Sequence, residues 1–257
     1  MKTLLQRLKH KLSPGWQAER LPQEKESVYF YTFHKCASSF FSSYVLKNIE
    51  GLKHVDYAML LWDKPPTYNE PLEFKRHGTI YGPIRLSAGA EITVKFLVEP
   101  SSNPEFVRDK SAIFFVRDPR AILVSRYYSF GFTHALNPNE EKRKAQLKRM
   151  EKIQTMTLDD YVLAHADKQV RDFAMMKGVA AGCKRKLVLK YEDMIDKFES
   201  FASDLRSFVE IRDEVIQHTY SSTRPRESVD NFSHHRSGHT QTFREELKPE
   251  TLVLLNQ

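Results

Sequence analysis

The chain has 257 residues, of which 40% are hydrophobic and 28% are charged. These values are ordinary for a soluble globular protein, and the length suffices for one large α/β domain or two small ones. The formal net charge of +7 favours anionic ligands or surfaces. Two cysteines, Cys36 and Cys183, exclude a disulfide framework and predict reduced thiols in a cytoplasmic setting.

Residues 1–12 place leucines at helical spacing among lysines and arginines. This pattern predicts a short helix packed on its own domain, a segment resting on an anionic membrane surface, or a presequence. It lacks the continuous apolar core of a secretory signal, and no stretch of the chain is apolar for long enough to span a bilayer. With a proline-containing connector at 13–25, the sequence predicts an N-terminal extension (1–25) on one domain covering 1–257.

Residues 27–41 are the stretch around which the chain is organised. An apolar and aromatic run (27–33) predicts a strand, residues 34–37 predict a tight turn, and residues 38–49 predict a helix with apolar positions on one side. The N–H groups and positive dipole end of a helix N-terminus favour a bound phosphate or sulfate, and Lys35 adds a mobile charge. The simpler interpretation is that Ser38 or Ser39 only caps the helix.

The remaining elements alternate between strand and helix. The irregular, aromatic-rich stretch 51–89 is typical of a substrate-facing wall, and half-buried loop packing explains its aromatics equally well. The charged run 139–152 predicts a solvated helix or a mobile excursion. The alternation indicates an α/β fold with a mostly parallel central sheet flanked by helices. The other predicted elements are strands at 91–98, 111–117 and 186–191, and helices at 120–130, 158–179 and around 198–209.

A second anion site is predicted around Arg117, which ends an apolar strand. Ligands of parallel α/β sheets gather at the carboxyl ends of strands. Asp118 and Pro119 open the next helix, and Ser125 lies about two helical turns beyond the Asp118 cap. An arginine fork and a hydroxyl can therefore meet on one phosphate, although Arg117 taken alone is as well explained by a surface ion pair.

Four segments, in chain order, resemble motifs of the sulfotransferases. His34-Lys35-Cys36-Ala37-Ser38-Ser39-Phe40 resembles their 5′-phosphosulfate loop, usually Pro-Lys-Ser-Gly-Thr-Thr-Trp. The run from Arg117 to Ser125 resembles their 3′-phosphate motif. Tyr191-Glu192-Asp193-Met194 is similar to a Tyr-Glu-Asp-Met that follows a later strand, and His235-Arg236-Ser237-Gly238 is similar to their C-terminal Arg-Lys-Gly loop.

The resemblance implies a P-loop NTPase-like sulfotransferase fold and a donor, 3′-phosphoadenosine 5′-phosphosulfate, used as co-substrate without a metal. It implies that Lys35 acts in catalysis and that the loop from His34 to Phe40 binds the 5′ end of the donor. Phe40 would stack on the adenine, and Tyr191 would lie near it. The residues implied at the 3′-phosphate are Arg117, Ser125, Arg236, Ser237 and Gly238.

The departures from the family pattern are informative. Ala37 replaces a glycine, so we expect this position to resist a positive φ, and Cys36 removes a hydroxyl. His34 replaces a proline and adds a possible donor. Many members carry a base histidine two residues after a lysine in the strand before the second motif; here Leu97 follows Lys95 in that way. We therefore expect the base elsewhere, first at Glu99 and then at His77, His54 or Asp56.

The leading hypothesis is sulfuryl transfer to a hydroxyl or amine of a small molecule, such as a specialised metabolite, with glycan and lipid acceptors as alternatives. A P-loop-like nucleotide kinase or GTPase is disfavoured because the Gly-x4-Gly-Lys-Ser/Thr sequence is absent. A non-catalytic anion- or nucleic-acid-binding protein is disfavoured because the basic residues are spread along the chain. The oligomeric state and the acceptor stay open.

Overall fold

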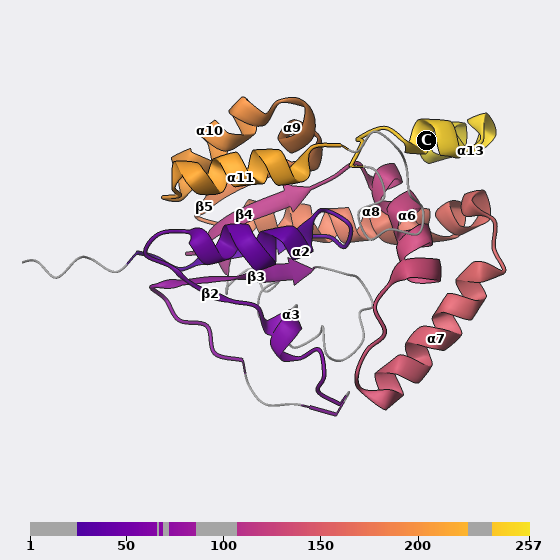
Figure 1. Cartoon of the computed structure of the whole chain (residues 1–257), viewed down its shortest axis with the longest axis horizontal. Helices are drawn as coiled ribbons and strands as arrows, with labels where there is room; N and C mark the ends of the chain where they lie inside the picture. Colours follow the sequence, from indigo (N-terminus) through magenta and orange to yellow (C-terminus); the bar gives the residue numbers. More distant parts are fainter. Residues whose placement is uncertain (1–24, 66, 69–71, 86–106, 226–237) are drawn as a thin grey trace, which may run out of the picture.

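The computed structural model describes residues 25–65, 67–68, 72–85, 107–225 and 238–257. In these ranges five strands form one sheet in the order β2-β3-β1-β4-β5, and every neighbouring pair is parallel (Figure 1). The strands are β1 (Val28–Thr32), β2 (Lys53–Val55), β3 (Thr79–Arg85), β4 (Ser111–Val116) and β5 (Arg185–Lys190).

Helical segments connect the strands and follow the last of them. Helix α2 (Ser38–Phe40) continues into a π-helical turn, η1 (Phe41–Val45), and a 3-10 turn, η2 (Leu46–Asn48). The others are α3 (Tyr57–Leu60), α6 (Pro119–Tyr128), the π-helical η3 (Ser129–Thr133), α7 (Glu140–Gln154), α8 (Leu158–Gly182), α9 (Tyr191–Asp196), α10 (Phe198–Phe208), α11 (Asp213–Thr223), α12 (Phe243–Glu246) and α13 (Pro249–Leu255).

One face of the sheet is covered by η1, α10 and α11. Phe30 of β1 stacks on Phe41 of η1 with ring centroids 5.2 Å apart, and Phe41 lies 4.5 Å from Phe115 of β4. Phe201 of α10 extends this cluster, 6.1 Å from Phe115. Because side chains alternate across a strand, Phe30 and Phe115 share this face and their neighbours point to the other.

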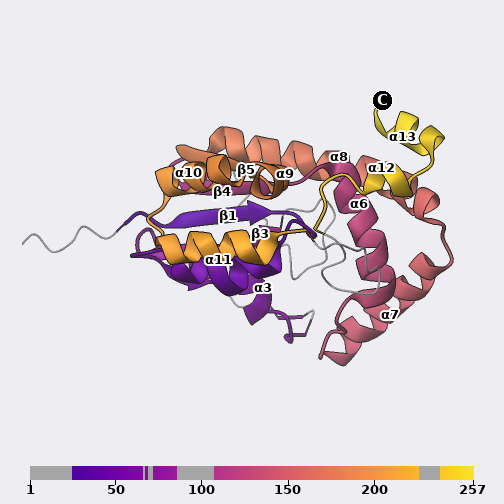
Figure 2. The same ribbon diagram turned by 45° about the horizontal axis from the view of Figure 1, so that its top comes forward.

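The opposite face is covered by α8. Tyr31 stacks on Phe114 with centroids 5.1 Å apart, and Phe33 stacks on Phe173 of α8 at 4.4 Å. Figure 2 shows α8 on one side of the sheet, with α11 and the segment that begins at α2 on the other. The prediction of a parallel α/β sheet flanked by helices is confirmed.

Several element predictions need correction. β2, β3 and α11 are additional elements; β3 crosses the stretch that the sequence left as irregular wall or loop. Of the two alternatives for the charged run, the helix is right, because α7 forms with Asn139 as its cap. The predicted strand 91–98 and the predicted N-terminal helix lie outside the described residues.

The strand register brings the predicted anion-binding segments to one edge. Thr32 pairs with Arg85 on one side and Phe115 on the other, and Val116 pairs with Lys190. The turn after β1, Arg117 after β4 and Tyr191 after β5 therefore all begin at the carboxyl edge of the sheet. That is the edge at which parallel α/β folds bind ligands.

Candidate active site

The turn after β1 is held in a left-handed conformation at two positions. Lys35 has φ 71° and Ala37 has φ 50°. The expectation that Ala37 resists a positive φ is wrong: its small side chain packs against the core, and the cost of about 1–2 kcal/mol for one left-handed residue is offset by the packed strand and helix on either side. Ala37 is also the residue that caps α2, without a side-chain hydrogen bond, so neither Ser38 nor Ser39 is the cap.

Cys36 faces the protein interior. Its side chain is fully buried, and burial raises the pKa of the thiol to about 11. The thiol is therefore protonated at neutral pH, and any contact of Cys36 with a ligand falls to its backbone. Ser38 is also buried, and its hydroxyl accepts a hydrogen bond from Arg85, whereas Ser39 is exposed.

Arg117 joins all four segments that carry the resemblance. Its Nη1 donates to the Lys35 carbonyl at 2.9 Å, and its Nη2 donates to the His239 carbonyl at 3.4 Å. Its guanidinium lies 4.2 Å above the centre of the Tyr191 ring. The Tyr191 hydroxyl in turn donates to the Gly238 carbonyl at 3.1 Å. The segments that carry the two predicted anion sites are therefore in direct contact.

The backbone conformation at position 238 requires a glycine. It has φ 77°, and a Cβ at this position would lie 3.1 Å from the Cα of Pro225. Burial raises the pKa of Tyr191, so the hydroxyl that holds the Gly238 carbonyl stays protonated. The described part of the C-terminal loop is thus fixed against α9.

Asp118 fixes the start of α6 as predicted. Its carboxylate accepts from the backbone and the guanidinium of Arg120, and its own N–H donates to Glu192 at 2.8 Å. Burial acts to raise the pKa of Asp118, but the hydrogen bonds and charge of Arg120 outweigh it and lower the pKa. A hollow of about 390 Å³ lies beside these carboxylates, lined by Val116, Arg117, Asp118, Lys190, Glu192 and Asp193. Its lining is mixed in charge, with three acidic and two basic residues.

Arg85 is the cation that sequence reasoning missed. Its Nη2 donates to the Ser38 hydroxyl at 3.0 Å, and its buried Nε has no hydrogen-bond partner among the described residues. Burial lowers the pKa of Arg85, with the charge of Asp56 opposing. A buried charge without a close ion pair costs several kcal/mol, and a bound anion would offset this. No local sequence signal marks it, because its place in the site depends on β3, which the sequence pattern does not predict.

The other predicted ligand residues that the structure describes belong to the segments that follow β1 and β4. Phe40 packs beside Tyr44 and His218, which lie against each other, so its ring already has aromatic neighbours. Ser125 lies in α6, and its hydroxyl makes no hydrogen bond to a described residue. His34 meets Phe130 edge-on at 5.6 Å; burial and then the charge of Arg85 hold the pKa of His34 well below its usual value. Arg236 and Ser237 lie outside the described residues.

The base candidates are dispersed. Glu99 lies outside the described residues. His77 precedes β3, at the opposite edge of the sheet from Lys35, so its nomination as a base is wrong. His54 is hydrogen-bonded to the Gly82 carbonyl at 2.7 Å. Asp56 caps α3 and accepts from the Ser42 hydroxyl, which leaves it engaged in structure.

A comparison with known families decides the assignment. The model of the sulfotransferase domain matches residues 100–252, more than half of the chain. The chain belongs to the sulfotransferase family. The match begins after the Lys35 turn and includes the Arg117, Tyr191 and Gly238 segments, so the contacts of Arg117 connect the matched region of this sulfotransferase to the turn before it. A search among curated proteins gave no match.

Two further findings concern the described part of the sulfotransferase. No helix in it is both long enough and apolar enough to cross a membrane. The residues described include no group of three histidines, cysteines or carboxylates placed to hold a metal ion.

Proposed function

We propose that this sulfotransferase moves a sulfuryl group from 3′-phosphoadenosine 5′-phosphosulfate to a hydroxyl or amine of a small-molecule acceptor. The observation that carries the proposal is the contact of Arg117 with the Lys35 turn, Tyr191 and the Gly238 loop. One arginine thereby links the segments that the family resemblance assigns to the two ends of the donor.

In the proposed reaction the bond between sulfur and the 5′-phosphate oxygen breaks while a bond forms between sulfur and the acceptor oxygen or nitrogen. Negative charge develops on the leaving bisphosphate, and preplaced positive charge stabilises it. Lys35 fills this role, and Arg85 reaches the same turn through its hydrogen bond to Ser38. Arg117, Ser125, Arg236, Ser237 and Gly238 hold the 3′-phosphate, and Tyr191 and Phe40 adjoin the adenine.

The proton of an alcohol acceptor requires a base. We assign it to Glu99, with His34 as the rival, because the neutral His34 imidazole adjoins Lys35 in the turn. Glu99→Gln should lower kcat by about 10²–10⁴-fold, the usual contribution of general base catalysis, and His34→Gln should lower it less. Rates are measured with saturating donor. If only His34→Gln lowers kcat, the base is His34 and not Glu99.

The proposed donor predicts a specific affinity. Calorimetry should show micromolar or tighter binding of adenosine 3′,5′-bisphosphate, and weaker binding of adenosine 5′-monophosphate, which lacks the 3′-phosphate. Absence of bisphosphate binding at micromolar protein would contradict the proposal. Magnesium-dependent ATP binding in its place would indicate the kinase alternative.

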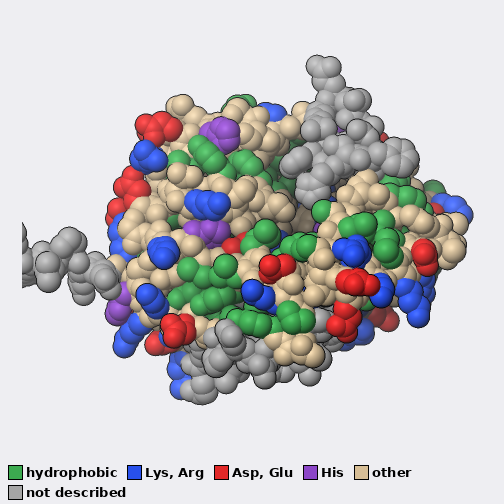
Figure 3. All heavy atoms as spheres, turned by 60° about the horizontal axis from the view of Figure 1, so that its bottom comes forward, with side chains coloured by type: hydrophobic (Ala, Val, Ile, Leu, Met, Phe, Trp, Pro, Cys, Tyr) green, Lys and Arg blue, Asp and Glu red, His purple; other side chains and the backbone are tan. Residues whose placement is uncertain are grey.

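A nucleic-acid-binding role has less support. On the face shown in Figure 3, basic and acidic side chains are interspersed among hydrophobic ones instead of forming a basic stripe. A continuous basic surface is the usual footprint of a nucleic-acid partner. Oligonucleotide affinity that falls steeply with salt would restore this alternative.

A further inference from the structure

Four basic side chains converge on one aromatic ring beside the Lys35 turn. The His34 and His134 rings lie 5.6 and 5.2 Å from the centre of the Phe130 ring. The guanidinium carbons of Arg126 and Arg149 lie 5.8 and 5.6 Å from it. These residues, here called the Phe130 cluster, come from the turn after β1, α6, η3 and α7. In Figure 1 the arrowheads of β3 and β4 point toward α6 and α7.

Among the described residues, the arginines of the cluster have no carboxylate partners. Neither Arg126 nor Arg149 forms an ion pair with a described residue, and neither does the neighbouring Arg85. Arg126 donates from Nη1 to the side-chain oxygen of Gln169 at 2.6 Å, which is a neutral acceptor. Arg149 is exposed and its charge is solvated, whereas the charge of the part-buried Arg126 is left uncompensated by the described residues.

Buried donors beside the cluster also lack partners. The Nε of Arg126, the hydroxyl of Ser129 and the side-chain nitrogen of Gln169 are buried without a hydrogen bond to a described residue. Gln169 is only 1% exposed and Ser129 only 3%. Each unpaired buried group costs about 1–3 kcal/mol. Water can satisfy a hydroxyl or an amide, but it does not neutralise the charge of the part-buried Arg126.

Cation–π contact does not account for the cluster either. An arginine over a phenylalanine ring contributes about 0.5–1 kcal/mol at an exposed site, and here two arginines share one ring at more than 5 Å. Their mutual repulsion and that of Arg85 oppose this gain. Burial and the charges of Arg85, Arg126, His134 and Lys35 lower the pKa of His34, in keeping with a locally positive field.

Resting on the proposed function, we propose that the sulfuryl acceptor is itself an anion, a hydroxylated carboxylate or a phosphate or sulfate ester, whose charged group binds Arg126 and Arg149. His34 connects the Phe130 cluster directly to Lys35, so an acceptor held there can present its hydroxyl to the catalytic turn. An arginine fork binds carboxylate, phosphate and sulfate oxygens through charge-assisted hydrogen bonds.

The donor does not account for these charges. In the proposed function its phosphate groups are held by Arg117, Lys35 and the loop after β1, on the side that faces Tyr191 and Gly238. The Phe130 cluster contacts the turn through His34 instead, from η3 and α7. A bound acceptor anion would also offset the positive charges that lower the pKa of His34.

The test is calorimetry on protein saturated with adenosine 3′,5′-bisphosphate. The probes are glucuronate, glucose 6-phosphate, glucose 6-sulfate and neutral glucose, so the comparison among the three charged sugars identifies the anionic group. At least one should bind tenfold or more tightly than glucose, as expected for a charge-assisted hydrogen bond. Arg126→Ala and Arg149→Ala should each remove most of this preference, and Arg126→Lys should retain part of it.

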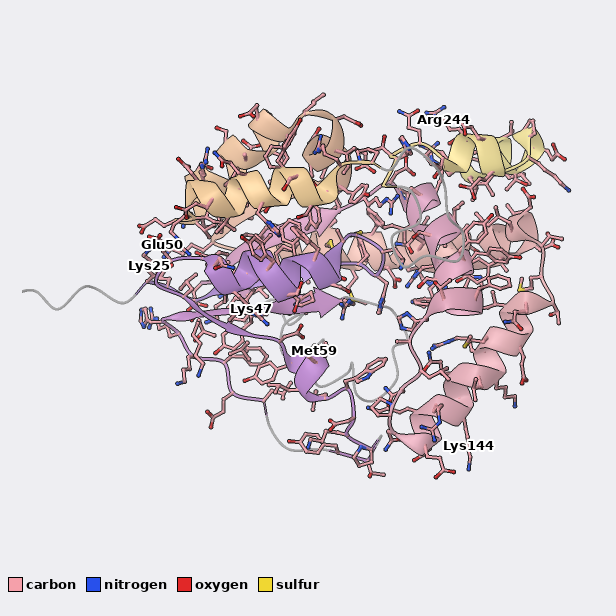
Figure 4. All side chains as sticks on the ribbon, in the orientation of Figure 1. Lys25, Lys47, Glu50, Met59, Lys144 and Arg244 are labelled. Atoms are coloured by element: carbon pink, nitrogen blue, oxygen red, sulfur yellow. The ribbon has the colours of Figure 1, made fainter. Side chains whose placement is uncertain are left out.

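Lys144→Ala is the matched control, because Lys144 is exposed on α7 and pairs with Glu140 at 2.8 Å (Figure 4). The Lys144→Ala variant should show the same preference for charged sugars as the unmodified protein. The proposal is overturned if charged and neutral sugars bind equally, or if none binds detectably at millimolar concentration. It is also overturned if the preference for charged sugars persists in both Arg126→Ala and Arg149→Ala. Bisphosphate affinity is measured on the same protein preparations. If the unmodified protein does not bind the bisphosphate, the proposed function itself fails. If the arginine variants bind it as the unmodified protein does, they are correctly folded.

Discussion

Lys35→Ala should lower kcat for sulfuryl transfer by about 10²–10³-fold or more, the usual cost of removing one preorganised donor to developing charge. Affinity for adenosine 3′,5′-bisphosphate should fall by a much smaller factor, because Arg117 and the loop amides remain. The reason is positional: Lys35 occupies the left-handed position that turns the chain from β1 toward α2, and its carbonyl is fixed by Arg117. Single-turnover rates and calorimetry separate the two effects.

Lys47→Ala provides the control for the change in net charge. Lys47 is exposed in η2, on the same helical segment that α2 begins (Figure 4). This variant should keep both rate and affinity within about twofold, as is usual for a surface substitution. If Lys35→Ala weakens bisphosphate binding as much as it slows turnover, Lys35 serves ground-state binding, and the proposed stabilisation of the leaving group is wrong.

The sheet could be predicted wherever local pattern and tertiary role agree. β1 and β4 are continuous apolar and aromatic runs, which is what a parallel strand covered on both faces requires. Arg117 and Tyr191 follow two strands that are neighbours in the sheet, so their proximity follows from topology alone. Asp118 and Pro119 start α6 by local chemistry that tertiary packing does not override.

β3 could not be predicted because it breaks the usual rules of a strand. Gly82 and Pro83 lie in its middle, although proline is normally excluded from central strands. The pairing with β1 shifts register at this point, and a Cβ at Gly82 would lie 2.6 Å from the Phe30 carbonyl. A glycine is therefore needed for the two strands to approach. Missing β3 also hid Arg85, whose place in the site depends entirely on that strand.

The turn after β1 shows the limit of reasoning from residue type. Alanine at a left-handed position is disfavoured in isolation, but the cost is small beside the packing of the strand and helix that it joins. The Phe130 cluster is a harder case, since its members come from four segments and only the fold brings them together. No local pattern in the sequence marks Arg149, on the exposed side of a charged helix, as a neighbour of Phe130.

Arg117→Ala should weaken the binding of adenosine 3′,5′-bisphosphate by about 30- to 150-fold, as expected for the loss of a charge-assisted hydrogen bond of about 2–3 kcal/mol. Binding of adenosine 5′-monophosphate should weaken much less. Arg117 also holds the Lys35 and His239 carbonyls, so its removal loosens the turn as well as removing charge. The ratio of the two affinities, measured by calorimetry, isolates recognition of the 3′-phosphate from this general loosening.

Two further variants make the comparison specific. Arg117→Lys retains the charge but cannot contact two carbonyls and the Tyr191 face together, so we expect an intermediate affinity ratio. Arg244→Ala removes an exposed arginine whose guanidinium lies 5.5 Å from the Phe243 ring, and it should leave the ratio unchanged (Figure 4). If Arg117→Ala weakens both nucleotides equally, Arg117 organises the turn without recognising the 3′-phosphate. In that case the role of Arg117 in the site would be limited to its hydrogen bonds to the Lys35 and His239 carbonyls, which do not depend on the 3′-phosphate of the ligand.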